Sequence, residues 1–94
     1  MASSMAGQLQ DKVALITGAG RGIGVGIANV LVERGASAAI CDIDGAAAEE
    51  TAKAINAAGG KAISGAVDVT DPESLDHFAT RTISELGGID ICVP

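Results

Sequence analysis

A run of glycines between a strand pattern and a helix pattern constrains this chain more than any other feature. Val13–Thr17 is a continuous apolar run rich in β-branched residues, which is typical of a strand buried on both faces. Gly18–Gly24 (GAGRGIG) follows directly. The next apolar residues recur at helical spacing, and they are Ile23, Ile27, Val30 and Leu31. A tight glycine turn that ends at a helix N-terminus offers backbone N–H groups and a positive dipole to an anion, so the segment predicts a phosphate-binding loop.

The glycine spacing excludes two common loops of this kind. The pattern G-x-G-x-x-G fails in every register, because glycine would be needed at Ile23, Val25 or Ile27. No G-K-[ST] triplet follows the glycines, so the loop is not of the Walker type. The pattern that fits is T-G-x-x-x-G-x-G, formed by Thr17, Gly18, Gly22 and Gly24.

Strand and helix patterns alternate along the rest of the chain, with short connections. Gly35 is expected to end the first helix. Further strands are expected over Ala38–Cys41, Ala62–Val67 and Ile89–Val93. Asp44 is expected to cap the second helix. The inner face of that helix would be Ala48, Thr51, Ala52 and Ile55.

The third helix is predicted to begin in a capping box formed by Thr70 and Glu73. Its apolar stripe would be Leu75, Phe78, Ala79, Thr82, Ile83 and Leu86. The resulting order, β-α-β-α-β-α-β, requires right-handed crossovers between parallel strands, so the predicted fold class is α/β. Residues 1–11 are expected to be a disordered leader before a single α/β unit.

Two aspartates follow predicted strands. Asp42 lies 18 residues after Gly24, where its carboxylate could accept hydrogen bonds from ribose hydroxyls. Asp42 could instead only begin the next loop, but the glycine loop at this spacing favours the ribose role. Asp68 follows the third strand, and its spacing fits a place near an adenine edge and a turn-forming role equally well.

Together these features resemble the short-chain dehydrogenase/reductase family. The resemblance extends from Lys12 to Pro94 and rests on Thr17–Gly24, Ala28, Gly35-Ala36, Asp42, Asp68-Val69 and Ile89–Ile91. It implies a Rossmann-type doubly wound parallel sheet in the order 3-2-1-4, truncated after the fourth strand. Residues 12–94 would be the N-terminal part of a single NAD(P)-binding domain. The implied cofactor-binding residues are Gly18, Arg21, Gly22, Ile23 and Gly24 at the glycine loop, Asp42 at the adenosine ribose, and Asp68 and Val69 at the adenine.

The resemblance also bears on the choice between NAD and NADP. A basic residue at the position of Arg21 often helps to hold the extra phosphate of NADP in the family. Asp42 opposes that role, because a carboxylate at the ribose repels a 2′-phosphate and Ile43, not a second basic residue, comes next. We therefore expect NAD as the cofactor.

Catalysis in this family uses a Ser and a Tyr-x-x-x-Lys pair beyond the region matched here. The chain contains no Tyr and ends one residue before the expected Asn-Ala-Gly, so by itself it is predicted to be inactive. The favoured hypothesis is an N-terminal fragment of an oxidoreductase that transfers hydride between NAD and an alcohol or ketone. Such an enzyme is expected to be a homo-oligomer. The alternatives are a non-catalytic NAD-binding module and an inert truncation product.

Composition narrows the possible partners. The formal net charge of −6 and a pI near 4.4 argue against nucleic acid as a partner. The sequence contains no stretch of 18 apolar residues, the length expected of a membrane-spanning helix. Cys41 and Cys92 each lie in an apolar strand pattern and are expected to be small core residues rather than a disulfide, which favours the cytoplasm. No metal site is predicted, and His77 is expected on a solvent-facing helix surface.

Overall fold

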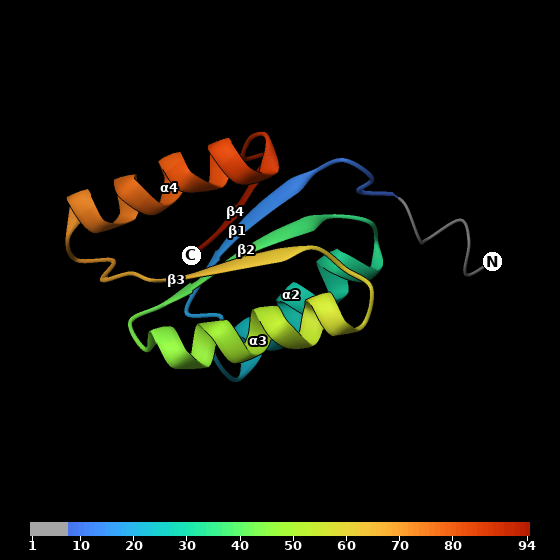
Figure 1. The fold of residues 1–94 in the computed structure, drawn as a ribbon, viewed down its shortest axis with the longest axis horizontal. Coiled ribbons are helices and arrows are strands. Elements are labelled where there is room, and N and C mark those ends of the chain that lie inside the picture. Colours follow the sequence, from blue (N-terminus) through green and yellow to red (C-terminus); the bar gives the residue numbers. More distant parts are fainter. Residues whose placement is uncertain (1–7) are drawn as a thin grey trace.

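The computed structural model describes residues 8–94, whose four strands form one parallel sheet in the order β3-β2-β1-β4 (Figure 1). The strands are β1 (Val13–Thr17), β2 (Ser37–Asp42), β3 (Ala62–Ala66) and β4 (Ile91–Val93). β1 lies in the middle and pairs with β2 and β4, while β3 pairs with the outer side of β2. The predicted fold class and strand order are confirmed.

Helices cover both faces of this sheet. α2 (Ile23–Glu33) and α3 (Gly45–Ala57) lie on one face, and α4 (Pro72–Leu86) lies on the other (Figure 1). Successive strand residues point to opposite faces, so each strand contributes to two cores. The α2/α3 side includes Ala14, Ile16, Ala28, Ala38, Ile40, Ala48, Ala52 and Ile55. The α4 side includes Leu15, Ala39, Cys41, Val67 and Phe78. Burial on both faces explains why β1 and β2 are continuous apolar runs.

The predicted apolar face of α2 is only partly correct: Leu31 packs against the core as expected, but two of its other residues do not. Ile23 is 82% exposed and Val30 is also exposed, whereas Ala28 is fully buried against the sheet. The small residues Gly24 and Ala28 allow the helix to approach the sheet closely, and Ile23 and Val30 are left exposed. A shallow apolar hollow of about 420 Å³ lies along this helix, lined by Ile23, Gly26, Ile27, Val30 and Leu31.

The start of α4 also differs from the prediction. Asp71, not Thr70, is the N-cap, and its side chain accepts a hydrogen bond from the N–H of Glu73 at 3.1 Å. Thr70 precedes the cap and belongs to the turn before α4, where its hydroxyl donates to Asp68 Oδ1 at 2.6 Å. The predicted capping box is therefore wrong. The predicted stripe of α4 holds except at Ile83, which is exposed. The Asp44 cap of α3 and the four inner-face residues of that helix are confirmed.

Hydrogen bonds join both ends of the described chain to segments that are distant in the sequence. Residues 8–11 form a turn in which the N–H of Leu9 donates to the carbonyl of Arg34 at 2.7 Å. This turn differs from the disordered leader expected over 1–11, of which residues 1–7 lie outside the described residues. β4 is shorter than predicted, and Asp90 before it uses its carboxylate to accept from the N–H of Val13 at 2.9 Å.

Candidate functional site

The glycine loop turns sharply from the end of β1 into α2. Gly18 has a φ of 65° and Gly22 a φ of 64°, values that residues other than glycine rarely adopt. Gly24 is needed for close packing instead, because a Cβ there would lie 2.5 Å from the Gly18 carbonyl oxygen. The N–H of Ala19 donates to the carbonyl of Cys41 at 3.2 Å, which ties the loop to β2. The predicted glycines thus come together in one tight turn.

The N-terminus of α2 lacks the side-chain cap that the other described helices have. Asp44 caps α3 and Asp71 caps α4, but Gly22 at the N-cap of α2 offers no side chain and the first turn holds no acidic residue. The first-turn N–H groups of a helix have no partner within the helix, and they carry its positive dipole. With Ile23 largely exposed, this helix end fits an anionic group such as a pyrophosphate.

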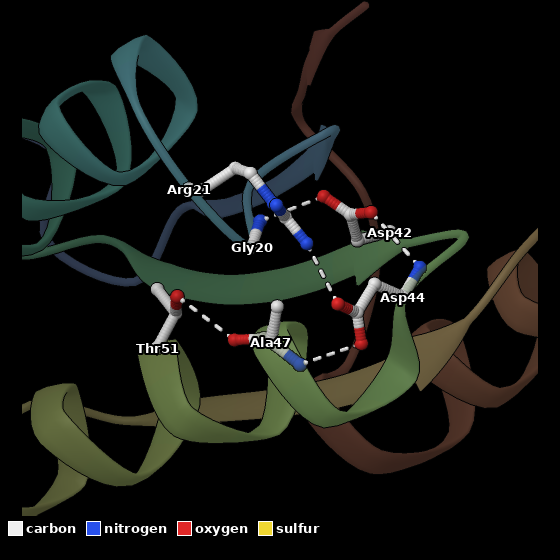
Figure 2. Close-up of polar contacts among 6 residues, drawn as sticks. All are labelled: Gly20, Arg21, Asp42, Asp44, Ala47 and Thr51. Atoms are coloured by element: carbon white, nitrogen blue, oxygen red, sulfur yellow. Dashed lines mark hydrogen bonds and ion pairs between the residues drawn. The ribbon is translucent and has the colours of Figure 1, made fainter.

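Asp42 connects this loop to the end of β2. Its Oδ2 accepts from the N–H of Gly20 at 3.0 Å, and its Oδ1 accepts from the N–H of Asp44 at 2.9 Å (Figure 2). The hydrogen bond from Asp44 is the main cause of a lowered pKa at Asp42; desolvation opposes it, and Gly20 and Arg21 add to it. The carboxylate is therefore ionised at neutral pH. A carboxylate has about four lone-pair directions, so two remain for hydroxyl donors.

Arg21 and Asp44 form an ion pair beside this carboxylate. Nη2 of Arg21 lies 2.7 Å from Oδ2 of Asp44, and the two side chains are 72% and 43% exposed. The other carboxylate oxygen of Asp44 accepts from the N–H of Ala47 at 3.1 Å as the cap of α3. Figure 2 shows this ion pair next to the hydrogen bond between Gly20 and Asp42. Asp44 was predicted only as a helix cap, and no sequence pattern indicated its ion pair with Arg21.

Gly20 is a second residue that sequence analysis missed. A Cβ on Gly20 would lie 2.8 Å from Asp42 Oδ2 and 2.8 Å from the Cβ of Ala47. Glycine at this position therefore allows the loop to contact Asp42 and α3 at once. The available signal was the second glycine of GAGRGIG, which the T-G-x-x-x-G-x-G pattern leaves unassigned.

Asp68 and Val69 follow the carboxyl end of β3, next to the carboxyl end of β2 where Asp42 lies. The end of β3 is joined to Asp42 by a hydrogen bond from the N–H of Val67 to the Asp42 carbonyl at 3.0 Å. Asp68 Oδ1 accepts from both the hydroxyl and the N–H of Thr70, and these bonds lower the pKa of Asp68. The structure thus shows the turn-forming role. Val69 is 58% exposed and Ile43 is 76% exposed, so the loops that follow β3 and β2 each present an apolar side chain to solvent.

The remaining candidates add no second site. His77 is exposed on α4, as predicted. Cys41 is buried, and burial is the main cause that raises its pKa to about 11, but Cys92 is exposed on the edge strand β4 and is not the core residue expected. Over residues 8–94 there is no group of three or more His, Cys, Asp or Glu side chains placed to hold a metal ion. Within the same range, no helix is long and apolar enough to cross a membrane.

Comparison with known families agrees with this geometry. Residues 12–94 match the model of the short chain dehydrogenase family, which places almost all of the chain in the match. The chain belongs to the short-chain dehydrogenase family. The match begins just before β1 and includes the glycine loop, Asp42 and Asp68.

Relatives of this short-chain dehydrogenase chain include a galactitol 2-dehydrogenase of Agrobacterium fabrum, 48% identical over 92% of this chain and 32% of the relative. A 7alpha-hydroxysteroid dehydrogenase of Escherichia coli is 41% identical over 92% of this chain and 34% of its own length. The chain therefore spans about a third of the length of the curated relatives it matches.

Solved structures of short-chain dehydrogenases superpose closely on the chain. A hydroxysteroid dehydrogenase from Escherichia coli gives a TM-score of 0.88 at 37% identity, over 98% of this chain and 38% of that one. A putative D-mannonate oxidoreductase from Haemophilus influenza with bound NAD gives 0.87 at 31% identity, over 97% of this chain and 32% of that one. The Rossmann-like arrangement of the four strands is thus that of the family.

Proposed function

We propose that this chain is the NAD-binding part of an oxidoreductase that transfers hydride between NAD and an alcohol or ketone. The observation that carries the proposal is the uncapped N-terminus of α2, which opens beside the ionised carboxylate of Asp42. One element suits a pyrophosphate and the other suits ribose hydroxyls, and the two are bonded to each other through Gly20. The bound NAD in one structural relative supports the same ligand class.

The proposed contacts divide the cofactor among three groups of residues. Backbone N–H groups of the loop and first turn of α2 would hold the pyrophosphate, at Gly18, Arg21, Gly22, Ile23 and Gly24. The Asp42 carboxylate would accept hydrogen bonds from the adenosine ribose. Asp68 and Val69 would lie at the adenine, where Ile43 adds apolar surface. NAD, when bound, would supply the hydride-accepting ring.

The preference for NAD over NADP follows from charge. Asp42 is ionised, and a 2′-phosphate beside it would meet like charge and would remove a hydroxyl donor. The alcohol or ketone substrate and the homo-oligomeric state belong to the whole enzyme and are proposed from the family. The 94 residues contain no tyrosine, so by themselves they would bind NAD without turnover by the family's mechanism.

A charge placed at Ile23 tests the proposal. Ile23→Glu puts a carboxylate in the first turn of α2 at an exposed position, which favours the helix dipole but repels a pyrophosphate. We expect NAD binding, measured by calorimetric titration, to weaken by about tenfold or more, which is about 1.4 kcal/mol. The thermal unfolding midpoint should stay the same or rise.

Asn29→Glu is the matched control, because it adds the same charge to an exposed position farther along α2. It should bind NAD like the wild type. Wild-type binding that is absent, or that is equal in the Ile23→Glu variant, would contradict the proposed site.

A further inference from the structure

Backbone hydrogen bonds position the Asp44 carboxylate of the Arg21–Asp44 ion pair. Asp44 Oδ1 is engaged by the N–H of Ala47, and the Asp44 N–H donates to Asp42 Oδ1. The remaining oxygen, Oδ2, faces the Arg21 guanidinium at 2.7 Å. A carboxylate that is already positioned by the backbone loses little freedom when it binds a cation. The capping role and the ion pair therefore support each other.

The location of the Arg21–Asp44 ion pair is relevant to the choice between NAD and NADP. Arg21 is the basic side chain of the glycine loop, and it is close enough to Asp42 to help lower the pKa of that carboxyl. A phosphate on the ribose hydroxyl that Asp42 binds would need this guanidinium as its counter-charge. In the structure, Nη2 of this guanidinium is already paired with Asp44 Oδ2 (Figure 2).

We propose that Asp44 is a positioning residue for cofactor choice, because it holds Arg21 away from a 2′-phosphate. This inference rests on the proposed NAD site. It makes Asp44 a second carboxylate, besides Asp42, that favours NAD over NADP. It also implies that replacing Asp42 alone leaves Arg21 paired with Asp44. NADP use would then rise less than the loss of one repulsive charge predicts.

The test uses two probes that carry only the adenosine half of the cofactor, ADP-ribose and ADP-ribose 2′-phosphate. Asp44→Ser retains a side-chain oxygen that can cap α3 but cannot reach Arg21 in the same way. We expect the ratio of the Kd for the 2′-phosphate to the Kd for ADP-ribose to fall about threefold to fivefold, which is the scale of an exposed ion pair. Asp44→Asn serves as a second variant that keeps the cap if circular dichroism shows that the serine variant is misfolded.

A double-mutant cycle with Arg21→Gln separates the proposed mechanism from the loss of one charge. If Asp44 acts through Arg21, the effect of Asp44→Ser on the Kd ratio should shrink to less than about twofold in the Arg21→Gln background. An equal effect in both backgrounds would overturn the inference while leaving the NAD site intact. Glu49→Gln breaks the exposed Glu49–Lys53 pair in α3 and should leave the ratio unchanged. Failure of the wild type to bind ADP-ribose would overturn this inference and the proposed function together.

Discussion

The backbone N–H of Gly20 donates to Asp42 Oδ2 at 3.0 Å, which joins the middle of the glycine loop to the end of β2. The two elements that would hold the pyrophosphate and the ribose therefore position each other before any ligand arrives. The contact depends on glycine, because a Cβ at this position would lie 2.8 Å from the same oxygen.

Gly20→Ala is expected to destabilise the chain by about 1–3 kcal/mol, because the added methyl group must displace the Asp42 carboxylate and the Cβ of Ala47. The measurement is urea-induced unfolding followed by circular dichroism. Gly26→Ala is the matched control: it lies within α2 and a Cβ there meets nothing within 4 Å. It should stabilise the chain by up to about 1 kcal/mol. Equal stabilities for the two variants would contradict the role assigned to Gly20.

The lowered pKa of Asp42 predicts a pH dependence of stability. A carboxyl group whose pKa is lower in the folded state stabilises the fold above its ordinary value of 3.8, and this contribution is lost as pH falls through the folded-state pKa. We expect the free energy of unfolding to decrease below about pH 4, and to decrease less in Asp42→Asn. An NMR titration of the Asp42 carboxyl carbon should give a midpoint below 3.8. A midpoint at or above that value would contradict the hydrogen bonds described here.

The two cysteines should differ strongly in thiol reactivity. Cys41 is fully buried with a pKa raised to about 11, so both access and thiolate fraction are low, whereas Cys92 is exposed. A disulfide reagent at pH 8 should label one thiol rapidly in the native chain and the second only after denaturation. Cys92→Ser should abolish the rapid phase. Loss of that phase in Cys41→Ser instead would show that β2 is not buried as described.

The sequence predicted the sheet well because burial on both faces leaves a strong signal in single strands. The runs Val13–Thr17 and Ala38–Cys41 lie in the centre of the sheet, where nearly every side chain is covered. The glycine positions were equally informative, because positive φ values at Gly18 and Gly22 restrict the residue type directly.

The errors arose where contacts between distant segments decide the outcome. Apolar spacing alone could not show that α2 would approach the sheet through Gly24 and Ala28, leaving Ile23 outside. The Arg21–Asp44 pair joins residues 23 positions apart, and no local pattern predicts it. Thr70 was assigned as a cap because Thr70 and Asp71 are both good capping residues, and only the formed turn shows that α4 begins after Asp71.

The 94-residue chain by itself is expected to show no hydride transfer. General acid–base catalysis requires a titratable group within hydrogen-bond reach of the reacting oxygen, and the tyrosine that serves this role in the family is absent from these residues. The measurement is NADH absorbance at high protein concentration with a panel of alcohols and ketones. Turnover that remains with the purified chain through successive columns would contradict this expectation.

The central claim is that NAD binds at the loop between β1 and α2, beside Asp42. The most direct test is a titration of ¹⁵N-labelled chain with NAD, followed by NMR of the backbone amides. The largest shift changes should fall on Gly20, Gly22, Ile23 and Gly24, with further changes at Asp42 and Val69. The amides of Gly59, Gly60 and Gly88 lie at the other end of the sheet, before β3 and β4, and their chemical shifts should not change. The absence of chemical-shift changes at saturating NAD, or changes confined to Gly59, Gly60 and Gly88, would contradict the account.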